Sequence, residues 1–251
     1  MTRCSKCQLW FPFPKSRILD CPHCGKHIII DINEKTTIVS SDRIKDYKPI
    51  IVGENIHRYK LTSNLWIDSE KPGISYKDIC VYKPPKILVR KTGVGISATI
   101  DYSNAYTNQV VYIFRPKDDT PLPIELFLGI LNSRAMYYYL VKNYGETEWR
   151  SHPYLTQKQV MDLPLPSIEI LQNGKSQLIE SFAKTLNPFL VSNKELPPGV
   201  DAKIERLVAG IFGLHEKDYE RVYSTLDYVE ELLPIRALKK INISDIFGNK
   251  D

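Results

Sequence analysis

Residues 85–93 read PKILVRKTG, and residues 97–101 read SATID. In the first stretch Ile87 and Val89 lie two positions apart, which is the period of a β-strand with one buried face. Gly93 and Gly95 favour a turn between a strand over 86–90 and a strand over 96–100. The two stretches therefore predict strands of one antiparallel sheet.

Short strand-like segments continue on both sides, from about Tyr47 to Phe114, and are interrupted by Gly53, Pro72-Gly73 and Pro84-Pro85. The last of them, residues 110–114, is β-branched and aromatic. This part of the chain is predicted to be a mostly antiparallel sheet.

The hydrophobic period changes near residue 123, where apolar residues fall at the spacing of one helix face. This pattern predicts a helix over 123–141, with residues 137–139 (Tyr-Tyr-Tyr) treated as core. Thr156 with Gln159 forms a capping box and predicts a second helix over 156–163. Further helices are expected around 178–186, from 200 to Gly213, and over 217–226, and Pro188 is expected to interrupt the C-terminal helices.

Two Cys-x-x-Cys pairs begin the chain: Cys4 with Cys7, and Cys21 with Cys24, separated by 13 residues. Two cysteines at this spacing can bind one ion from a tight turn, and two such turns complete a tetrahedron of thiolates. The pattern predicts a zinc ribbon over residues 1–40, with a structural Zn²⁺ held by these four cysteines.

Other uses of the cysteines stay open. A pair of disulfides fits an oxidising compartment, a redox dithiol needs one pair rather than two, and His23 or His27 offers an alternative ligand. The fifth cysteine, Cys80, is expected to be a buried core residue.

The fold class predicted from these patterns is α+β. A mostly antiparallel β domain over 41–166, with helices at 123–141 and 156–163, follows the ribbon, and a helical region over 167–251 packs on it. Of the 251 residues 43% are hydrophobic, and the net charge of +5 is compatible with a polyanionic partner. The apolar runs are too short to span a membrane and the N-terminus does not read as a signal peptide, so a cytoplasmic protein is expected.

Five segments in this order resemble the specificity domain of adenine-N6 DNA methyltransferases of the TaqI class and the target-recognition domains of Type I and Type IIG restriction systems. They are KPIIVGENIHRY (48–59), PKILVRKTG (85–93), ELFLGILNSRAMYYYL (125–140), YLTQKQVMDLPLP (154–166) and DAKIERLVAGIFGLHEKDYERV (201–222). The resemblance covers about residues 48–226 and implies a domain that recognises duplex DNA.

The sequence departs from these methyltransferases at their catalytic motifs. The enzymes carry a glycine-rich loop for S-adenosylmethionine and an Asn/Asp-Pro-Pro-Tyr/Phe motif, whereas the Pro-Pro pairs here lie in KPPK (83–86) and LPPG (196–199). A set of acidic residues for metal-dependent DNA cleavage is not recognised either. The resemblance therefore implies a specificity module that is not an enzyme by itself and has no S-adenosylmethionine site.

The candidate DNA contacts are of two kinds. Cations bind phosphates, and arginine and amide groups bind base edges. Arg90 is expected to bind guanine with its forked guanidinium group, and Lys91 to bind phosphate. The full set is Arg58, Lys86, Arg90, Lys91, Tyr102, Asn104, Tyr106, Asn108, Arg150 and His152. The alternatives are a charged strand edge at 83–91, a polar turn at 102–109, a structural role for 57–59, and a loop at 149–154 that packs on the ribbon.

The function expected from the sequence is sequence-specific recognition of double-stranded DNA, beside a separate methyltransferase or nuclease subunit. Two alternatives are the C-terminal part of a methyltransferase or methyltransferase-nuclease enzyme, and a zinc-ribbon adaptor that binds protein. A homodimer for a palindromic target, or a second module for a bipartite one, is left open.

Overall fold

A computed structural model describes residues 1–62, 65–117, 119–144, 154–167, 169, 171, 175–227 and 233–248. The chain forms two compact units. Met1–Ile51, Ser63–Lys83 and Asn104–Tyr106 make up the first, and Val52–Thr62, Pro84–Ser103 and Thr107–Asp251 make up the second. Antiparallel strands in small sheets precede mostly C-terminal helices, which confirms the α+β class. The division at residues 40 and 166 stays a prediction.

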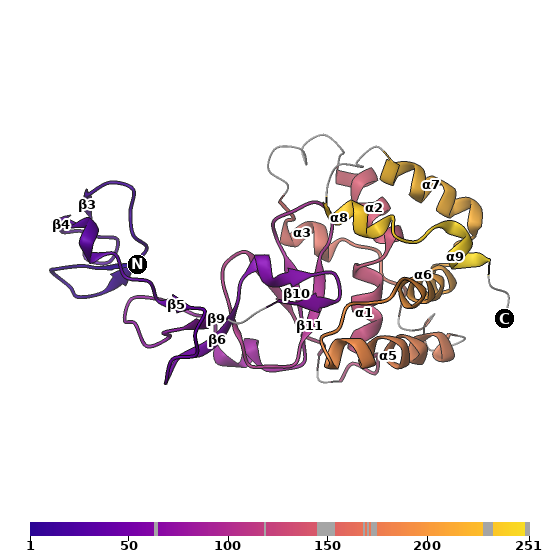
Figure 1. The fold of residues 1–251 in the computed structure, drawn as a ribbon, viewed down its shortest axis with the longest axis horizontal. Helices are drawn as coiled ribbons and strands as arrows, with labels where there is room; N and C mark the ends of the chain where they lie inside the picture. Colours follow the sequence, from indigo (N-terminus) through magenta and orange to yellow (C-terminus); the bar gives the residue numbers. More distant parts are fainter. Residues whose placement is uncertain are drawn as a thin grey trace. The chain divides into compact units, whose positions relative to one another are not determined.

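The N-terminal ribbon, residues 1–30, consists of two short hairpins in the first unit (Figure 1). β1 (Thr2–Arg3) pairs antiparallel with β2 (Trp10–Phe11), and β3 (Ile18–Asp20) with β4 (His27–Ile29). Three apolar side chains, Phe11, Ile28 and Ile30, are buried together with two of the cysteines. So small a core gives the ribbon little apolar burial to hold it together.

A four-stranded sheet follows the ribbon, in the order β12-β6-β9-β5. Its strands are β5 (Val39–Ser40), β6 (Lys48–Ile51), β9 (Leu65–Ile67) and β12 (Tyr106–Thr107), and β9 is antiparallel to both β5 and β6. Two 3-10 turns, η1 (Ile32–Glu34) and η3 (Ile79–Tyr82), lie in the connecting segments of the first unit.

The second unit contains a three-stranded antiparallel sheet in which β10 (Lys86–Arg90) lies between β11 (Ala98–Asp101) and β13 (Val111–Phe114). These strands confirm the predicted ones. β10 and β11 are buried along nearly their whole length. A 3-10 turn, η2 (Gly53–Asn55), leads into the hairpin of β7 (Ile56–His57) and β8 (Lys60–Leu61), which contacts this sheet. The strands expected upstream thus pair in separate small sheets rather than in one.

The helix predicted over 123–141 is two helices, α1 (Ile124–Leu131) and α2 (Arg134–Tyr144). The break has a clear cause. The side chain of Asn132 binds both the N–H and the carbonyl of Ala98 on β11, at 3.0 and 2.9 Å. Ser133 Oγ then accepts the N–H of Met136 at the start of the next helix, at 3.1 Å. Of residues 137–139, which are predicted to be core, Tyr137 is buried, whereas Tyr138 and Tyr139 are half-buried.

The remaining helices agree with the sequence pattern except at one proline. They are α3 (Gln157–Met161), α5 (Ser176–Val191), α6 (Pro198–Phe212), α7 (Glu216–Asp227), α8 (Leu233–Leu238) and α9 (Ile243–Phe247). Pro188 lies inside α5 and does not interrupt it. One lost backbone hydrogen bond is tolerated there because Leu186 and Leu190, on either side of the proline, are both buried in the core. Gly213 ends α6 with a φ of 68°, as predicted.

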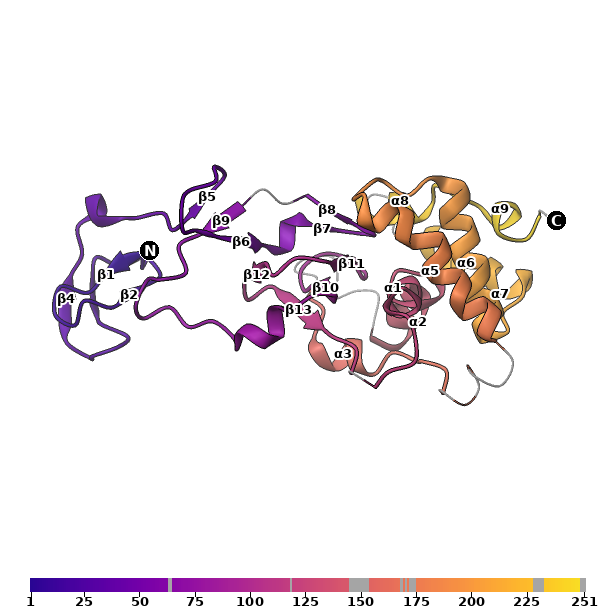
Figure 2. The same ribbon diagram turned by 90° about the horizontal axis from the view of Figure 1, so that it is seen from below.

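α1 lies between the three-stranded sheet and helices α5 and α6 (Figures 1 and 2). Its side chains Leu126 and Leu128 are fully buried in the main core, together with Phe182 of α5 and Ile204 of α6. This packing supports the loops at the end of β10, where the candidate interface lies. Among the described residues, no helix is both long and apolar enough to cross a membrane.

Candidate nucleic-acid interface and metal centre

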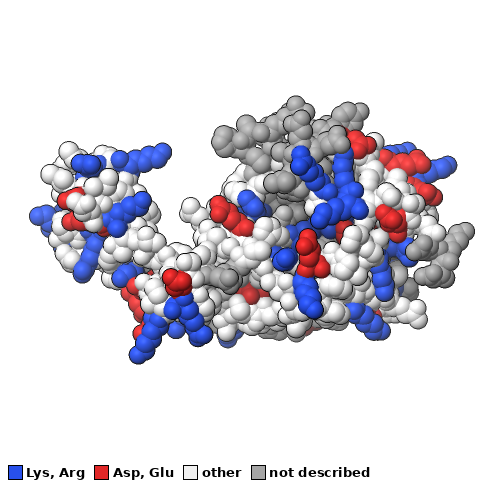
Figure 3. Space-filling model, viewed as in Figure 1, with Lys and Arg blue, Asp and Glu red and all other residues white. Residues whose placement is uncertain are grey.

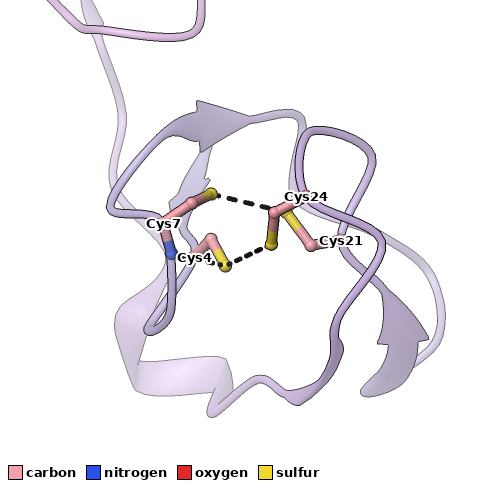
Figure 4. A group of neighbouring side chains, drawn as sticks. All are labelled: Cys4, Cys7, Cys21 and Cys24. Atoms are coloured by element: carbon pink, nitrogen blue, oxygen red, sulfur yellow. Dashed lines mark hydrogen bonds between the residues drawn. The ribbon is translucent and has the colours of Figure 1, made fainter.

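The four cysteines of the ribbon lie together (Figure 4). Cys4 Sγ is 4.0 Å from Cys24 Sγ, and Cys7 Sγ is 3.8 Å from Cys21 Sγ. All four sulfur atoms lie within 4.8 Å of one another. Thiolates at about 2.3 Å from a tetrahedral Zn²⁺ stand roughly 3.8 Å apart. The sulfur positions therefore fit the predicted ligand set.

The backbone makes the same turn at each cysteine pair. Gln8 and Gly25 have φ values of 66° and 67°, and their N–H groups donate to the carbonyls of Cys4 and Cys21 at 2.9 Å. The N–H groups of Cys7 and Lys6 donate to Cys4 Sγ at 3.5 and 3.3 Å, and together with the neighbouring sulfur atoms they lower the pKa of the Cys4 thiol to about 6, whereas the pKa of Cys7 is raised to about 11. A thiol with a lowered pKa is more readily the thiolate, which is the form that binds metal.

Neither nearby histidine belongs to the sulfur cluster. His23 Nε2 lies 2.9 Å from a backbone carbonyl of β2, and His27 Nδ1 lies 3.0 Å from Asp20 Oδ1. Cys80 does not belong to it either, and the expectation that it is buried is wrong. In η3 the buried side chain is that of Tyr82, whereas Cys80 is exposed.

A cleft of about 910 Å³ lies within the second unit, between the β7–β8 hairpin, the loop that joins β10 to β11, and the residues around the α1–α2 junction. We call it the basic cleft, because His57, Arg58, Lys60 and Arg90 line it. Glu195 is the acidic side chain among its described lining residues. Figure 3 shows Lys and Arg side chains gathered on one face of the second unit, beside several acidic ones.

The positive charge of the basic cleft is concentrated around His57. Burial and the nearby charges of Arg90 and Lys60 lower the pKa of His57. Within the described part of the chain, no carboxylate forms an ion pair with Arg90 or Lys60. The two cations are therefore available to an anionic partner such as the phosphates of DNA.

Arg58 differs from these two cations, because its charge is offset inside the fold. Its guanidinium donates to Asp201 Oδ1 at 2.6 Å and to the carbonyl of Asn132 at 2.9 Å, and lies over the ring of Tyr59. The side chain is 15% exposed. Arg58 thus adds little positive potential to the cleft, and its contact with DNA stays a prediction.

Lys86 is not available to DNA, and we correct that expectation. Its side chain is 0% exposed, with Nζ 2.5 Å from Asp101 Oδ2 and bonded to the carbonyl of Ser103. Burial lowers the pKa of Lys86. Both faces of β10 are buried, so this side chain points into the protein, where Asp101, its register partner on β11, compensates the charge.

Lys91 follows Arg90 but contacts a different group of residues. Its Nζ lies 4.3 Å from the ring centroid of Tyr112, and burial together with the neighbouring Tyr154 raises the pKa of the Tyr112 hydroxyl. Tyr154 is 54% exposed. This group presents a cation and aromatic rings beside the end of β10, a combination that suits contact with phosphate and sugar.

The four candidates of residues 102–108 are not gathered into one surface. Tyr102 is exposed and its hydroxyl bonds to Asn187 of α5 at 3.3 Å. Asn104 is exposed. Tyr106 packs in the first unit against two other tyrosine rings, and Asn108 Oδ1 accepts the N–H of Val110 in a turn. Their DNA contacts stay predictions.

The candidates Arg150 and His152 lie outside the described residues. Conversely, sequence reasoning missed Lys60 and Thr92, which line the basic cleft with Arg90. Lys60 follows the turn residues 57–59, so a hairpin at that point would have predicted it. Thr92 carries no signal beyond its place two residues after Arg90.

Residues 48–165 match a family model described as the TaqI-like C-terminal specificity domain. No curated protein matches the chain. The matched segment contains strands β6 to β13 and helices α1 to α3. It therefore includes Lys60, Arg90 and Lys91, whereas the cysteine cluster precedes it. Residues 48–165 are thus similar to a specificity-type domain of the kind associated with DNA methyltransferases.

Proposed function

We propose that this chain recognises a short sequence in duplex DNA as the non-catalytic specificity module of a restriction-modification system, beside a separate adenine-N6 methyltransferase or nuclease subunit. The observation that supports the proposal is the basic cleft, whose basic side chains all belong to the segment that matches the specificity domain, whereas Glu195, Ala237 and Leu238 line it from outside that segment. Arg90 and Lys60 lack carboxylate partners among the described residues, so their charges suit a polyanion.

The ribbon has a structural part in this proposal. Four thiolates around one Zn²⁺ leave no coordination position for a substrate, so the metal would stabilise the ribbon and take no part in a reaction. The proposal places catalysis on another polypeptide or on a further part of a longer one, because the sequence carries no recognised methyltransferase motif.

Binding to duplex DNA at several salt concentrations tests the proposal. Each phosphate contact contributes about 0.9 to the slope of log affinity against log salt. Lys60→Ala is expected to weaken binding and to reduce this slope by about one contact. Lys184→Ala is the matched control, because Lys184 is exposed on α5 and pairs with Glu180 outside the cleft. Absence of salt-dependent binding, or an equal loss in both variants, would contradict the proposal.

A second candidate function is protein docking by the ribbon. Ile18 and Ile29 face each other across β3 and β4 and are 55% and 74% exposed. An exposed apolar pair of this kind favours contact with another protein. Replacing both by Thr should leave DNA affinity unchanged and weaken association with the catalytic subunit. Loss of DNA affinity in this variant would count against protein docking as the role of these two side chains.

A further inference from the structure

Arg90 is the last residue of β10, and its side chain lies next to two glycines. A Cβ built on Gly53 would lie 3.7 Å from Arg90 Cγ, and one built on Gly93 would lie 3.7 Å from Arg90 Nε. The Arg90 side chain thus passes close to two glycine backbones at the edge of the basic cleft. Because neither glycine carries a side chain, the space next to the Arg90 side chain stays open.

Thr92 adds a polar restraint on the same side chain. Arg90 Nε donates to Thr92 Oγ1 at 3.3 Å. Because Nε donates to Thr92, the two terminal nitrogens of Arg90 remain available as a pair of donors, which we call the fork. No described residue forms a hydrogen bond or ion pair with this end of Arg90, in contrast to Arg58, whose guanidinium is bound to Asp201.

Thr92 is itself anchored by the segment that precedes α3. Thr92 and Tyr154 form an isolated antiparallel bridge, and the N–H of Leu155 donates to the carbonyl of Lys91 at 2.7 Å. Leu155 is buried in the main core. The loop that carries Thr92 is therefore fixed to the body of the unit, and so is the position of the Arg90 fork.

We infer that Arg90 reads a guanine in the major groove with its two terminal nitrogens, and that Thr92 is its positioning residue. This inference rests on the proposed function and names the residue that supplies part of its specificity. A planar guanidinium held at Nε presents two parallel donors, which match the O6 and N7 acceptors of guanine. Lys60 and Lys91 carry compact charges on flexible stems, so they suit phosphates.

Selection of binding sites from a randomised duplex DNA library tests the inference, with the zinc-loaded full chain and four variants. Arg90→Lys keeps the charge and removes the fork, Thr92→Val removes the acceptor at nearly constant volume, and Thr92→Ser keeps the acceptor. Lys60→Ala is the control for a phosphate contact.

The wild-type chain is expected to select a motif with an invariant G·C pair. Arg90→Lys should lose the preference at that pair by roughly 10-fold to 100-fold and leave the other positions and the salt slope unchanged. Thr92→Val should weaken the same preference and Thr92→Ser should restore it. Lys60→Ala should weaken binding to all sequences equally.

Two results would overturn the inference. If Arg90→Lys keeps the whole motif, Arg90 does not read a base. If Thr92→Val lowers affinity for all sequences equally, Thr92 supports the fold and does not position the fork. A wild-type chain that binds no duplex and selects no motif would instead overturn the proposed function, so the two failures are distinguishable.

Discussion

Arg134 and Glu205 form an ion pair in which neither side chain has exposed surface, with Nη1 and Oε2 3.0 Å apart. Arg134 also binds Asp201 at 2.9 Å, which in turn binds Arg58. The hydroxyl of Tyr219 donates to Glu205 at 3.0 Å. Two arginines and two carboxylates balance in charge, so the network joins the β7–β8 hairpin, α2, α6 and α7 without an unpaired buried charge.

Glu205→Gln is expected to lower the free energy of unfolding by roughly 3 kcal/mol, because it leaves the buried Arg134 without a full counter-charge. Urea denaturation followed by circular dichroism measures the change. Glu180→Gln is the control, since the Glu180–Lys184 pair is exposed and should contribute well under 1 kcal/mol. Equal stability of the two variants would show that the buried network is not stabilising.

Acid should destabilise the protein through Asp201. Burial opposes ionisation, but Arg58 and Arg134 outweigh it and lower the pKa of Asp201 to about 2. Because this pKa lies below the unfolded value, the carboxylate contributes stability above about pH 4 and loses it as the pH falls towards 2. The contribution is roughly 2 kcal/mol.

The acid dependence is measurable as the midpoint of urea unfolding between pH 5 and pH 2. Asp201→Asn should be less stable at pH 5 and should show a shallower loss below pH 4. Asp119→Asn, a change at an exposed turn, should follow the wild-type curve. Parallel curves for the wild type and Asp201→Asn would exclude Asp201 as the titrating group.

Zinc should be bound with one ion per chain and released by a strong chelator, with loss of structure in the ribbon. Cys21→Ser should lower the bound zinc and expose Phe11 and Ile28, which are buried with Cys21. Metal analysis and hydrogen exchange of residues 1–30 report the two effects. Cys80→Ser is the control, because Cys80 is exposed and outside the cluster, and it should retain the ion.

Gly129→Ala is expected to destabilise the second unit by roughly 1–3 kcal/mol. A Cβ at this position of α1 would lie 2.6 Å from ring atoms of Phe182, which is fully buried. Gly199→Ala, in the first turn of α6, meets no atom within 4 Å and should be neutral or slightly stabilising. Thermal unfolding compares the two, and a similar midpoint for both would indicate that α1 and α5 move apart at little cost.

Features with a local signal were predictable from the sequence. The two Cys-x-x-Cys pairs predicted the cluster of four sulfur atoms, because one tight turn is enough to bring the two cysteines of each pair together. Thr156 and Gln159 gave the start of α3, and the structure has both hydrogen bonds of the capping box. The alternation at Ile87 and Val89 gave β10.

Features that depend on distant partners were not predictable. The sequence around Lys86 indicates a surface cation, but in the structure Asp101 of β11 lies next to it and forms a buried ion pair. The helix over 123–141 looked continuous because nothing near Asn132 indicates that its side chain binds Ala98, 34 residues away. Likewise Arg58 binds Asp201, which lies 143 residues further along the chain. The sequence around Arg58 therefore does not indicate that its charge is compensated.

The chain passes between its two units at residues 51/52, 62/63, 83/84, 103/104 and 106/107. No single peptide-bond cleavage therefore separates one unit from the other as an intact fragment. A hybrid protein made by joining the first half of this chain to the second half of a relative would keep the first unit whole and divide the second unit between the two parents, because Val52–Thr62 and Pro84–Ser103 precede the join. Exchange of target preference between such chains would need either transfer of the entire 48–165 segment or point changes at its surface.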